Sequence, residues 1–314
     1  MSHLAIKKSS SSVIEGACAL HIDASGKSVI LGDHEKLQSV DTRIDSDSIT
    51  VTIHGNLERP LLFSADCMHD INLVVNSEKK AQIVIGPSLS SRWRIELANR
   101  TEGDIFCWPT SKKMAVSQSW SVMVEQEARL RFFELGLADE KTSRGIDAVL
   151  HGEHAHMAYF GVDQLQGDAQ KSSTLAITHK ARRSTSKQSF RGVYGGNAKA
   201  RFLGKVIVEQ AAASCKAEQL YKSILLSEQA HAYVMPELEI HNSDVSASHG
   251  ASIGELDAAS LFYLGSRGLS LADAKALLIL SLLDDIFDEI TEPSIKNAVR
   301  QLFLTNVQTT MVRS

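Results

Sequence analysis

Alternating apolar and polar residues run through most of the chain, from about residue 28 to residue 245. Clear examples are Ile49–Ile53, Ala81–Ile85, Trp93–Leu97 and Trp120–Val124. Because successive side chains of a β-strand point to opposite faces, this period of two is typical of half-buried strands. Clusters of Gly, Asn, Asp and Ser lie between these segments and favour turns, whereas helical spacing is nearly absent. We therefore predict an all-β core.

Three architectures accommodate many short strands that no helix separates: a sandwich, a closed barrel, and a solenoid of stacked coils. A strict short repeat, such as a hexapeptide, would favour the solenoid, but the sequence contains none. The strand pattern alone therefore leaves the choice open.

Helical spacing begins after Asp257, whose side chain is predicted to cap a helix over Ala258–Leu264. Ser270 and Asp273 resemble a capping box at the start of a second helix. Pro293 suits the first turn of a third helix. We therefore divide the chain into three parts: an N-terminal segment (1–27), a β core (28–256) and a small helical C-terminal domain (257–314).

The charge balance excludes broad classes of partner. Lys and Arg number 33 against 37 acids, so the net charge of -4 is too near neutral for a general nucleic-acid or membrane-surface binder. The first residues lack the apolar stretch of a secretory signal. The apolar run Ala274–Leu283 is interrupted by Lys275 and Ser281 and has about half the length that a membrane span requires. We expect a cytoplasmic protein that binds neither nucleic acid nor membrane.

The four cysteines stand far apart and form no C-x-x-C pair, so free thiols are expected and a local zinc site is disfavoured. These residues are Cys18, Cys67, Cys107 and Cys215.

Two clusters invite a binding interpretation. In the segment His151–His156, His154 and His156 would share a face of a strand and suggest a metal site, although a solvated strand face is favoured. Lys180 to Lys205 contains eight basic residues and no acid, which suggests a phosphate-binding face. Because those charges can point to different sides of a solenoid, solvated surface or a subunit contact is favoured there.

Four acids crowd the end of the second helix: Asp284, Asp285, Asp288 and Glu289. The helix dipole is negative at that end, so the acids are unfavourable there. An electrostatic cost with no local benefit suggests a binding partner, and a frayed acidic end is the alternative.

Several short motifs follow one another in the second half of the chain. In order they are Thr178–His179, Ser189–Gly192, Pro236–Ile240, Asp244–Val245, Ser248–Ala251, Gly254–Asp257, Leu261–Leu264 and Ser266–Gly268. Each motif is weak alone, but together and in this order they are specific. From Ile177 onward, over about the last 140 residues, the chain resembles the SufB/SufD family of iron–sulfur cluster assembly scaffolds.

This resemblance implies a right-handed parallel β-helix, and so it selects the solenoid. It further implies a heterodimer of SufB and SufD, near whose interface a transient iron–sulfur cluster is built. Each helical C-terminal domain of such a pair holds one SufC ATPase. The residues expected to contact SufC here are Asp257, Phe262, Tyr263, Arg267, Asp284, Asp285 and Asp288.

The resemblance is to SufD rather than SufB. SufB-like chains carry a cysteine where this chain has Tyr221, and a carboxylate where Gly250 follows His249. A cysteine often found in SufD-like chains is replaced by Ala247. What remains is His249, whose neutral imidazole is a competent iron ligand. We predict that His249 contributes to a cluster site completed by another chain, with His179 as a second candidate.

Two alternatives stay open. Larger family members have a helical domain before the β-helix, whereas this chain reaches strands by about residue 28, so a self-pairing scaffold that works with SufC alone is one alternative. The other is a carbohydrate-active β-helix enzyme, for which Glu125, Glu127 and Glu134 are candidate acids. The chain has no GxxxxGK[ST] loop, so ATP hydrolysis is assigned to the partner and no enzymatic activity is expected of this chain.

Overall fold

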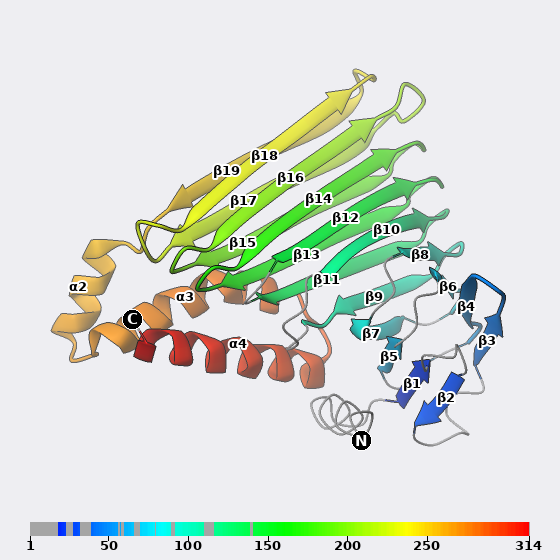
Figure 1. The fold of residues 1–314 in the computed structure, drawn as a ribbon. Helices are drawn as coiled ribbons and strands as arrows, with labels where there is room; N and C mark the ends of the chain where they lie inside the picture. The colour runs from blue at the N-terminus through cyan, green and yellow to red at the C-terminus, as the bar shows by residue number, and fades with distance from the viewer. Residues whose placement is uncertain are drawn as a thin grey trace.

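The computed structural model describes residues 18–22, 28–31, 39–55, 57, 60–65, 70–78, 80–88, 92–109, 116–138 and 141–313. Cys67 and most of the predicted segment 1–27 lie outside these residues. The described chain forms a stack of coils whose strands lengthen towards the C-terminal end, followed by helices that lie beside the stack (Figure 1).

The strands form two sheets, and from β4 onwards successive strands alternate between them, so that each coil contributes one strand to each sheet. Sheet A has the spatial order β19 (Val245–Gly254), β17 (Cys215–Leu225), β15 (Thr185–Tyr194), β13 (His156–Leu165), β11 (Arg129–Ala138), β9 (Glu102–Cys107), β7 (Ala81–Ser88), β5 (Leu61–Ala65), β1 (Cys18–Ile22) and β2 (Ser28–Leu31). Sheet B has the order β18 (His231–Ile240), β16 (Lys199–Val208), β14 (Gln170–His179), β12 (Lys141–Leu150), β10 (Val116–Val124), β8 (Arg92–Leu97), β6 (Asp70–Val75), β4 (Ser48–Ile53) and β3 (Val40–Ile44).

Neighbouring strands are parallel, except that β1 pairs antiparallel with β2 and β3 with β4. His156, for example, lies opposite Thr185, 29 residues further along the chain. Parallel neighbours separated by a whole coil define a β-helix. The predicted fold class, a parallel β-helix followed by a small helical part, is confirmed.

Stacked side chains fill the interior between the two sheets. Because the coils pair in register, residues at equivalent positions lie directly above one another. The ring of Trp93 stacks on that of Trp120 at 4.7 Å, and Phe190 stacks on Tyr221 at 5.0 Å. The predicted strand Ile49–Ile53 lies within β4, whose residues alternate between half-buried and buried. The alternation of apolar and polar residues in the sequence therefore corresponds to strands with one face pointing into this core.

One corner of each coil repeats the same backbone conformation. Glu127, His154, Arg183 and Ser214 all have positive φ, between 56° and 59°. Their N–H groups donate to carbonyls of the following coil, as Arg183 does to Ala213 at 2.9 Å. The hydrogen bonds between coils stabilise a conformation that residues with side chains rarely adopt. The prediction that His154 and His156 share a strand face is therefore wrong: His154 occupies a corner, and His156 begins β13.

Three helices follow the last strand: α2 (Ala258–Ser266), α3 (Leu271–Phe287) and α4 (Pro293–Arg313). Asp257 caps α2 by accepting a hydrogen bond from the Ser260 N–H at 2.8 Å. Ser270 Oγ accepts one from the Asp273 N–H at 3.1 Å. Both predicted caps are confirmed. Within the described part of the chain, no helix combines the length and apolarity that would let it cross a membrane.

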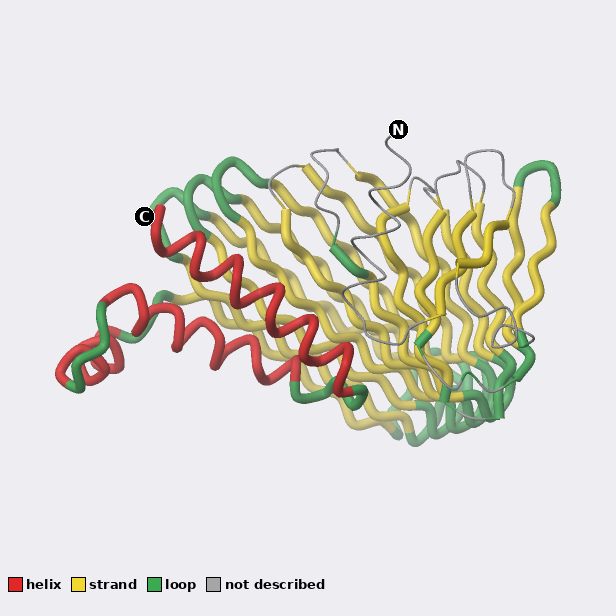
Figure 2. Tube along the Cα trace, turned by 90° about the horizontal axis from the view of Figure 1, so that it is seen from below, coloured by secondary structure: helices red, strands yellow, loops and turns green. Residues whose placement is uncertain are grey.

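Helices α3 and α4 lie side by side against the outer face of sheet A (Figure 2). Phe106, Phe133 and Phe160 stack along that face at 4.6 and 4.9 Å. They belong to one apolar cluster with Phe287 of α3 and Phe303 of α4. The outward residues of β13 are therefore buried as well as the inward ones. Helix α2 has no buried residue and projects beyond this cluster.

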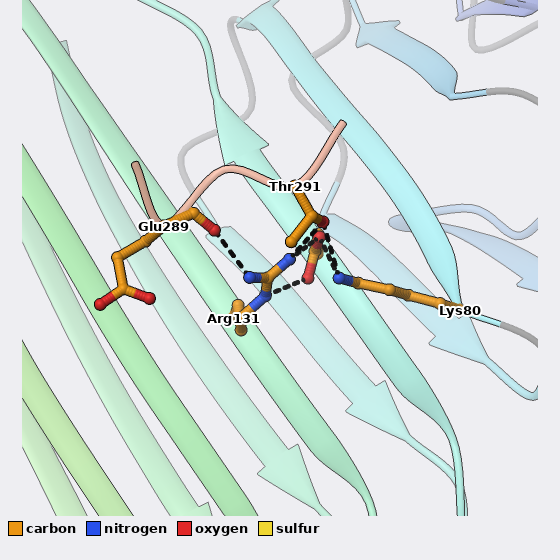
Figure 3. Close-up of polar contacts among 5 residues, drawn as sticks. Lys80, Arg131, Glu289 and Thr291 are labelled. Carbon is orange, nitrogen blue, oxygen red and sulfur yellow. Dashed lines mark hydrogen bonds and ion pairs between the residues drawn. The ribbon is translucent and has the colours of Figure 1, made fainter. Parts of the chain in front are cut away.

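A buried carboxylate and two partly exposed cations fasten the turn between α3 and α4 to the sheet (Figure 3). Asp104, whose side chain is 1% exposed, is paired with Arg131 and with Lys80, the latter at 2.8 Å. Arg131 also donates to the Glu289 carbonyl at 2.7 Å and to Thr291 Oγ1 at 2.9 Å. We call these five residues the clasp. One carboxylate thus orients two cations that hold the helical turn.

Replacing the clasp carboxylate should loosen the helices. Asp104→Asn leaves Arg131 and Lys80 beside each other without a counter-charge, which should lower the free energy of unfolding by about 2–4 kcal/mol. Urea denaturation followed by circular dichroism measures this change. Asp288→Asn is the control. Asp288 is exposed and pairs with Lys296 at 2.7 Å, so loss of this ion pair should change stability far less. Equal effects of the two substitutions would show that the clasp does not hold the helices.

Candidate functional site

The last coil of the stack is open. Strand β19 ends sheet A and β18 ends sheet B, so among the described strands each has a sheet neighbour on one side only, β17 and β16 respectively. The other side of each strand presents unpaired backbone N–H and C=O groups. Such edges are templates for pairing with another chain.

The open coil also leaves part of the core uncovered. In the register of β17 and β19, Cys215 lies opposite Val245, Gln219 opposite His249, and Ser223 opposite Ile253. Paired residues of parallel strands point to the same face, so these β19 residues continue the inward-facing column of β17. The β17 residues are buried, whereas Ile253 is 44% exposed. We call the resulting surface the open mouth; it comprises Val234, Leu238, Ile240, Val245, Ala247, His249, Ala251 and Ile253.

His249 is the imidazole of the open mouth. Its side chain is exposed and makes no hydrogen bond or ion pair with the residues that the structure describes. The residue beneath it, Gln219, is buried and donates to Gln188 Oε1 at 3.0 Å. The ring therefore stands among apolar neighbours, with its nitrogens available to a group outside this chain. Its role as an iron ligand remains a prediction.

His179 occupies a very different environment. It is fully buried at the end of β14, and its two ring nitrogens contact Ser184 Oγ and Ser186 Oγ, both at 2.8 Å. Burial lowers the pKa of His179 to about 4, because the charged ring would be desolvated. Both ring nitrogens are hydrogen-bonded and the side chain has no exposed surface, so this geometry disfavours the prediction that His179 is a metal ligand. It braces a coil corner instead.

The interior contains a buried ionic network. Glu134, with no exposed surface, contacts Lys171 at 2.7 Å and Arg144 at 3.1 Å and accepts a hydrogen bond from Tyr159 at 2.7 Å. Burial alone would raise the pKa of Glu134, but the two cations outweigh it and hold that pKa at about 2. Lys171 also pairs with Asp163. The carboxylate of Glu134 therefore stays ionised, and the charges of Lys171 and Arg144 balance its charge.

This arrangement bears on the enzyme alternative. Glu125 contacts the His151 ring at 3.0 Å, and Glu127 pairs with Arg100 at 3.2 Å, both at coil corners. Glu134 is enclosed in the interior. A glycosidase needs two carboxyl groups on either side of one accessible groove. These three acids do not converge in that way.

The acids at the end of α3 all have partners within the chain. The pairs are Asp284 with Arg300 at 2.9 Å, Asp285 with Arg191 at 2.9 Å, Asp288 with Lys296 at 2.7 Å, and Glu289 with Lys187 at 2.8 Å. The premise that they lack a local benefit is therefore wrong. Arg191 is 5% exposed, so its pair with Asp285 fastens α3 to sheet A. Lys187 and Arg191 lie about a hundred residues from their acids, so no local pattern in the sequence indicates these two pairs.

Helix α2 presents exposed apolar residues next to the open coil. Phe262 is 80% exposed and Tyr263 55% exposed, and Arg267 lies over the Tyr263 ring at 5.2 Å. Leu271, at the start of α3, is 62% exposed. Of the residues predicted to bind a partner, Asp257 is used as the helix cap. Large apolar side chains gathered on one exposed helix are typical of a protein–protein contact.

Two of the four thiols are enclosed in the protein. Cys107 and Cys215 are free and buried, and burial raises the pKa of the Cys107 thiol to about 12. No group of three or more His, Cys, Asp or Glu side chains arranged to hold a metal ion occurs among the residues that the structure describes. Within that part of the chain, His249 is therefore a single candidate ligand and not a member of a preformed site.

Comparison with known proteins finds similarity to iron–sulfur cluster assembly proteins. The profile of a family described as "SUF system FeS cluster assembly, SufBD core domain" matches residues 107–282, which include the open mouth and α2. An iron–sulfur cluster assembly SufBD family protein of Synechocystis is 31% identical over 204 residues, which are 64% of this chain and 43% of that protein.

Two bacterial relatives carry the name SufD. The iron–sulfur cluster assembly protein SufD of Bacillus subtilis is 32% identical over 131 residues, 42% of this chain and 30% of the relative. SufD of Escherichia coli is 29% identical over 114 residues, 36% of this chain and 27% of the relative. The chain thus spans less than half the length of each of these relatives.

Acid should destabilise the corner that His179 braces. The pKa of His179 is about 4 in the folded chain against about 6.5 in an unfolded one, so the unfolded state binds the proton more readily. The neutral ring therefore contributes its full stabilisation above pH 6.5 and loses it as the pH falls towards 4, by about 3 kcal/mol. Urea denaturation at several pH values measures this for the wild-type chain and for His179→Gln. The stability difference between the two should shrink by that amount on acidification; a constant difference would contradict the assignment.

Proposed function

The chain belongs to the SufBD family of iron–sulfur cluster assembly proteins and is most like SufD, and on this premise we propose that it is a scaffold subunit without catalytic chemistry of its own. In this proposal it pairs with SufB, holds a SufC ATPase, and helps to position a nascent iron–sulfur cluster. The cluster is cargo that is assembled and passed on.

The open mouth is the observation that supports the proposal most directly. Its apolar side chains are exposed in the isolated chain, and two unpaired strand edges border it. A second β-helix presenting the same kind of edge would extend both sheets and cover Ile240 and Ile253 at once. Burial of that apolar area is the main driving force for such pairing.

His249 would stand inside the covered interface. It is the imidazole of the open mouth, and its neighbours Val245, Ala247 and Ala251 offer no metal ligand. A neutral imidazole and thiolates are suitable iron ligands. Since the thiols of Cys107 and Cys215 are buried, the remaining ligands would come from SufB. Covering by the partner would also shield the cluster from water.

Helix α2 is the proposed contact for SufC. Phe262 and Tyr263 form its exposed apolar surface, and Arg267 adds a positive charge beside them. The acids of α3 are paired inside the chain, so they serve this contact indirectly, by fixing the helices on sheet A. A nucleotide-driven movement of SufC would then act on α2, which directly follows the last strand.

Isolation of the native complex tests the proposal. The chain, tagged and expressed with the SufB and SufC of its own source, should purify with both, and native mass spectrometry should give one copy of this chain per SufB. Phe262→Asp should abolish retention of SufC while keeping SufB, because it buries a charge in the contact. Ile44→Asp, which alters an exposed apolar residue on β3 at the other end of sheet B, is the matched control and should retain both.

The composition of the complex separates the alternatives. Two copies of this chain with SufC and without SufB would replace the heterodimer by the self-pairing scaffold. If the Phe262→Asp variant retains both SufB and SufC, the SufC contact lies elsewhere on the chain.

The role of His249 is tested in the assembled complex. His249→Ala removes an exposed side chain, so the fold and the retention of partners should be unchanged. Cluster formation, followed by visible absorption during anaerobic reconstitution with iron and sulfide, should fall by about tenfold or more. His151→Ala, in which an imidazole that is 58% exposed is removed from a distant corner, should form clusters normally. Equal cluster yield in the two variants would refute the proposed ligand.

A further inference from the structure

A pocket of about 580 Å³ lies on the outer face of sheet B, away from the clasp and the helices. It crosses the starts of five strands, from β10 to the edge strand β18. Its size is in the usual range for sites that bind small molecules. Most of its wall is apolar, although several of its residues carry a charge at the tip.

The register of sheet B arranges the lining residues in two rows. Lys141, Gln170, Lys199 and His231 lie opposite one another on successive strands and form the first row. The second row runs parallel to it, one outward-facing position further along, and consists of Ser117, Ser143, Ser172, Arg201 and Tyr233. Short serine side chains thus lie beside longer cationic ones. The second row ends at the aromatic ring of Tyr233.

The charges of this pocket are of one sign. Its lining contains four basic residues and no acid. Lys171 is buried and pairs with Glu134 and Asp163, whereas Lys141, Lys199 and Arg201 form no ion pair with a carboxylate of the residues that the structure describes. Other basic residues close to Lys199 and Arg201 in the sequence are paired with acids: Lys187, Arg191 and Lys205. Unneutralised cations around a concave surface attract a small anion.

Tyr233 makes the pocket suitable for more than an inorganic anion. The guanidinium of Arg201 lies 5.7 Å from the centre of the Tyr233 ring, which is itself 53% exposed. A planar ligand can stack on this pair, as aromatic and guanidinium groups both favour. From Tyr233 on β18 to Lys141 on β12 is three strand spacings, about 14 Å. That span suits a molecule with an aromatic ring at one end and phosphates at the other.

We propose that this pocket binds a nucleotide, with the base on Tyr233 and Arg201 and the phosphates on Lys199, Lys141 and the serine hydroxyls. Lysine ammonium groups and hydroxyls supply the charge-assisted hydrogen bonds that phosphate oxygens accept. The apolar stems of the lysines and the tyrosine ring line the space for the base and the sugar. The site is independent of SufC, whose own nucleotide would be bound by a different chain.

Isothermal titration calorimetry of the isolated chain tests this site with three probes: ADP, inorganic pyrophosphate and adenosine. ADP should bind most tightly, because only it offers both the ring and the phosphates. Lys199→Gln should weaken ADP binding by about tenfold, the effect of one lost charge-assisted hydrogen bond to phosphate. Arg201→Gln should also weaken ADP binding, because it removes the guanidinium on which the base stacks. Tyr233→Ala should weaken the binding of ADP and leave that of pyrophosphate unchanged.

Lys216→Gln is the matched control, since Lys216 is exposed on β17 of the other sheet and its loss changes the net charge equally. Its ADP affinity should equal that of the wild-type chain. All four variants alter exposed residues, so circular dichroism should show an unchanged fold. No ADP binding, or equal weakening by Lys199→Gln and Lys216→Gln, would overturn the proposal. Pyrophosphate binding as tightly as ADP would also overturn it, because the base would then contribute nothing.

Discussion

In-register stacking of one coil on the next is the constraint on which the whole structure depends. An inward side chain is buried only when the following coil covers it: Tyr221 is 3% exposed below β19, whereas Ile253 on β19 itself is 44% exposed. Because burial of apolar surface contributes about 25 cal/mol per Å², the last coil keeps an unused driving force for association. The candidate site is thus a direct result of the architecture, and His249 is placed in it by the register that aligns it with Gln219.

The helices act as a second layer whose position is set by charge. Apolar contacts through Phe133 and Phe287 bury α3 and α4 on sheet A but tolerate sliding, since they have little directional preference. The clasp and the pair of Arg191 with Asp285 supply direction. The result is that α2 is held at a fixed place beside the open coil while none of its residues is buried. Helix α2 directly follows β19, so a movement of α2 would act on the end of the last strand.

Local features were predictable from the sequence, and long-range ones were not. The strand over Ile49–Ile53 and the caps at Asp257 and Ser270 depend on neighbouring residues, and the alternation and capping patterns identified them. The stacking of coils was inferred from family resemblance, because side chains meet about thirty residues apart, as His156 does with Thr185. The partners of Asp285 and Glu134 follow from that stacking and left no local signal. The burial of His179 follows from the same stacking, and no local feature of its motif indicates it.

The two ends of the described stack differ in a way that limits its growth. At the end opposite β18 and β19, the sheets finish with β2 and β3, which run antiparallel to their neighbours and interrupt the repeating register. A body with matching surfaces at both ends would add subunits without limit and form filaments. If the chain pairs through the open mouth as proposed, mouth-to-mouth contact would use up that end in both participants. Assembly would then terminate at two bodies related by a twofold or pseudo-twofold axis.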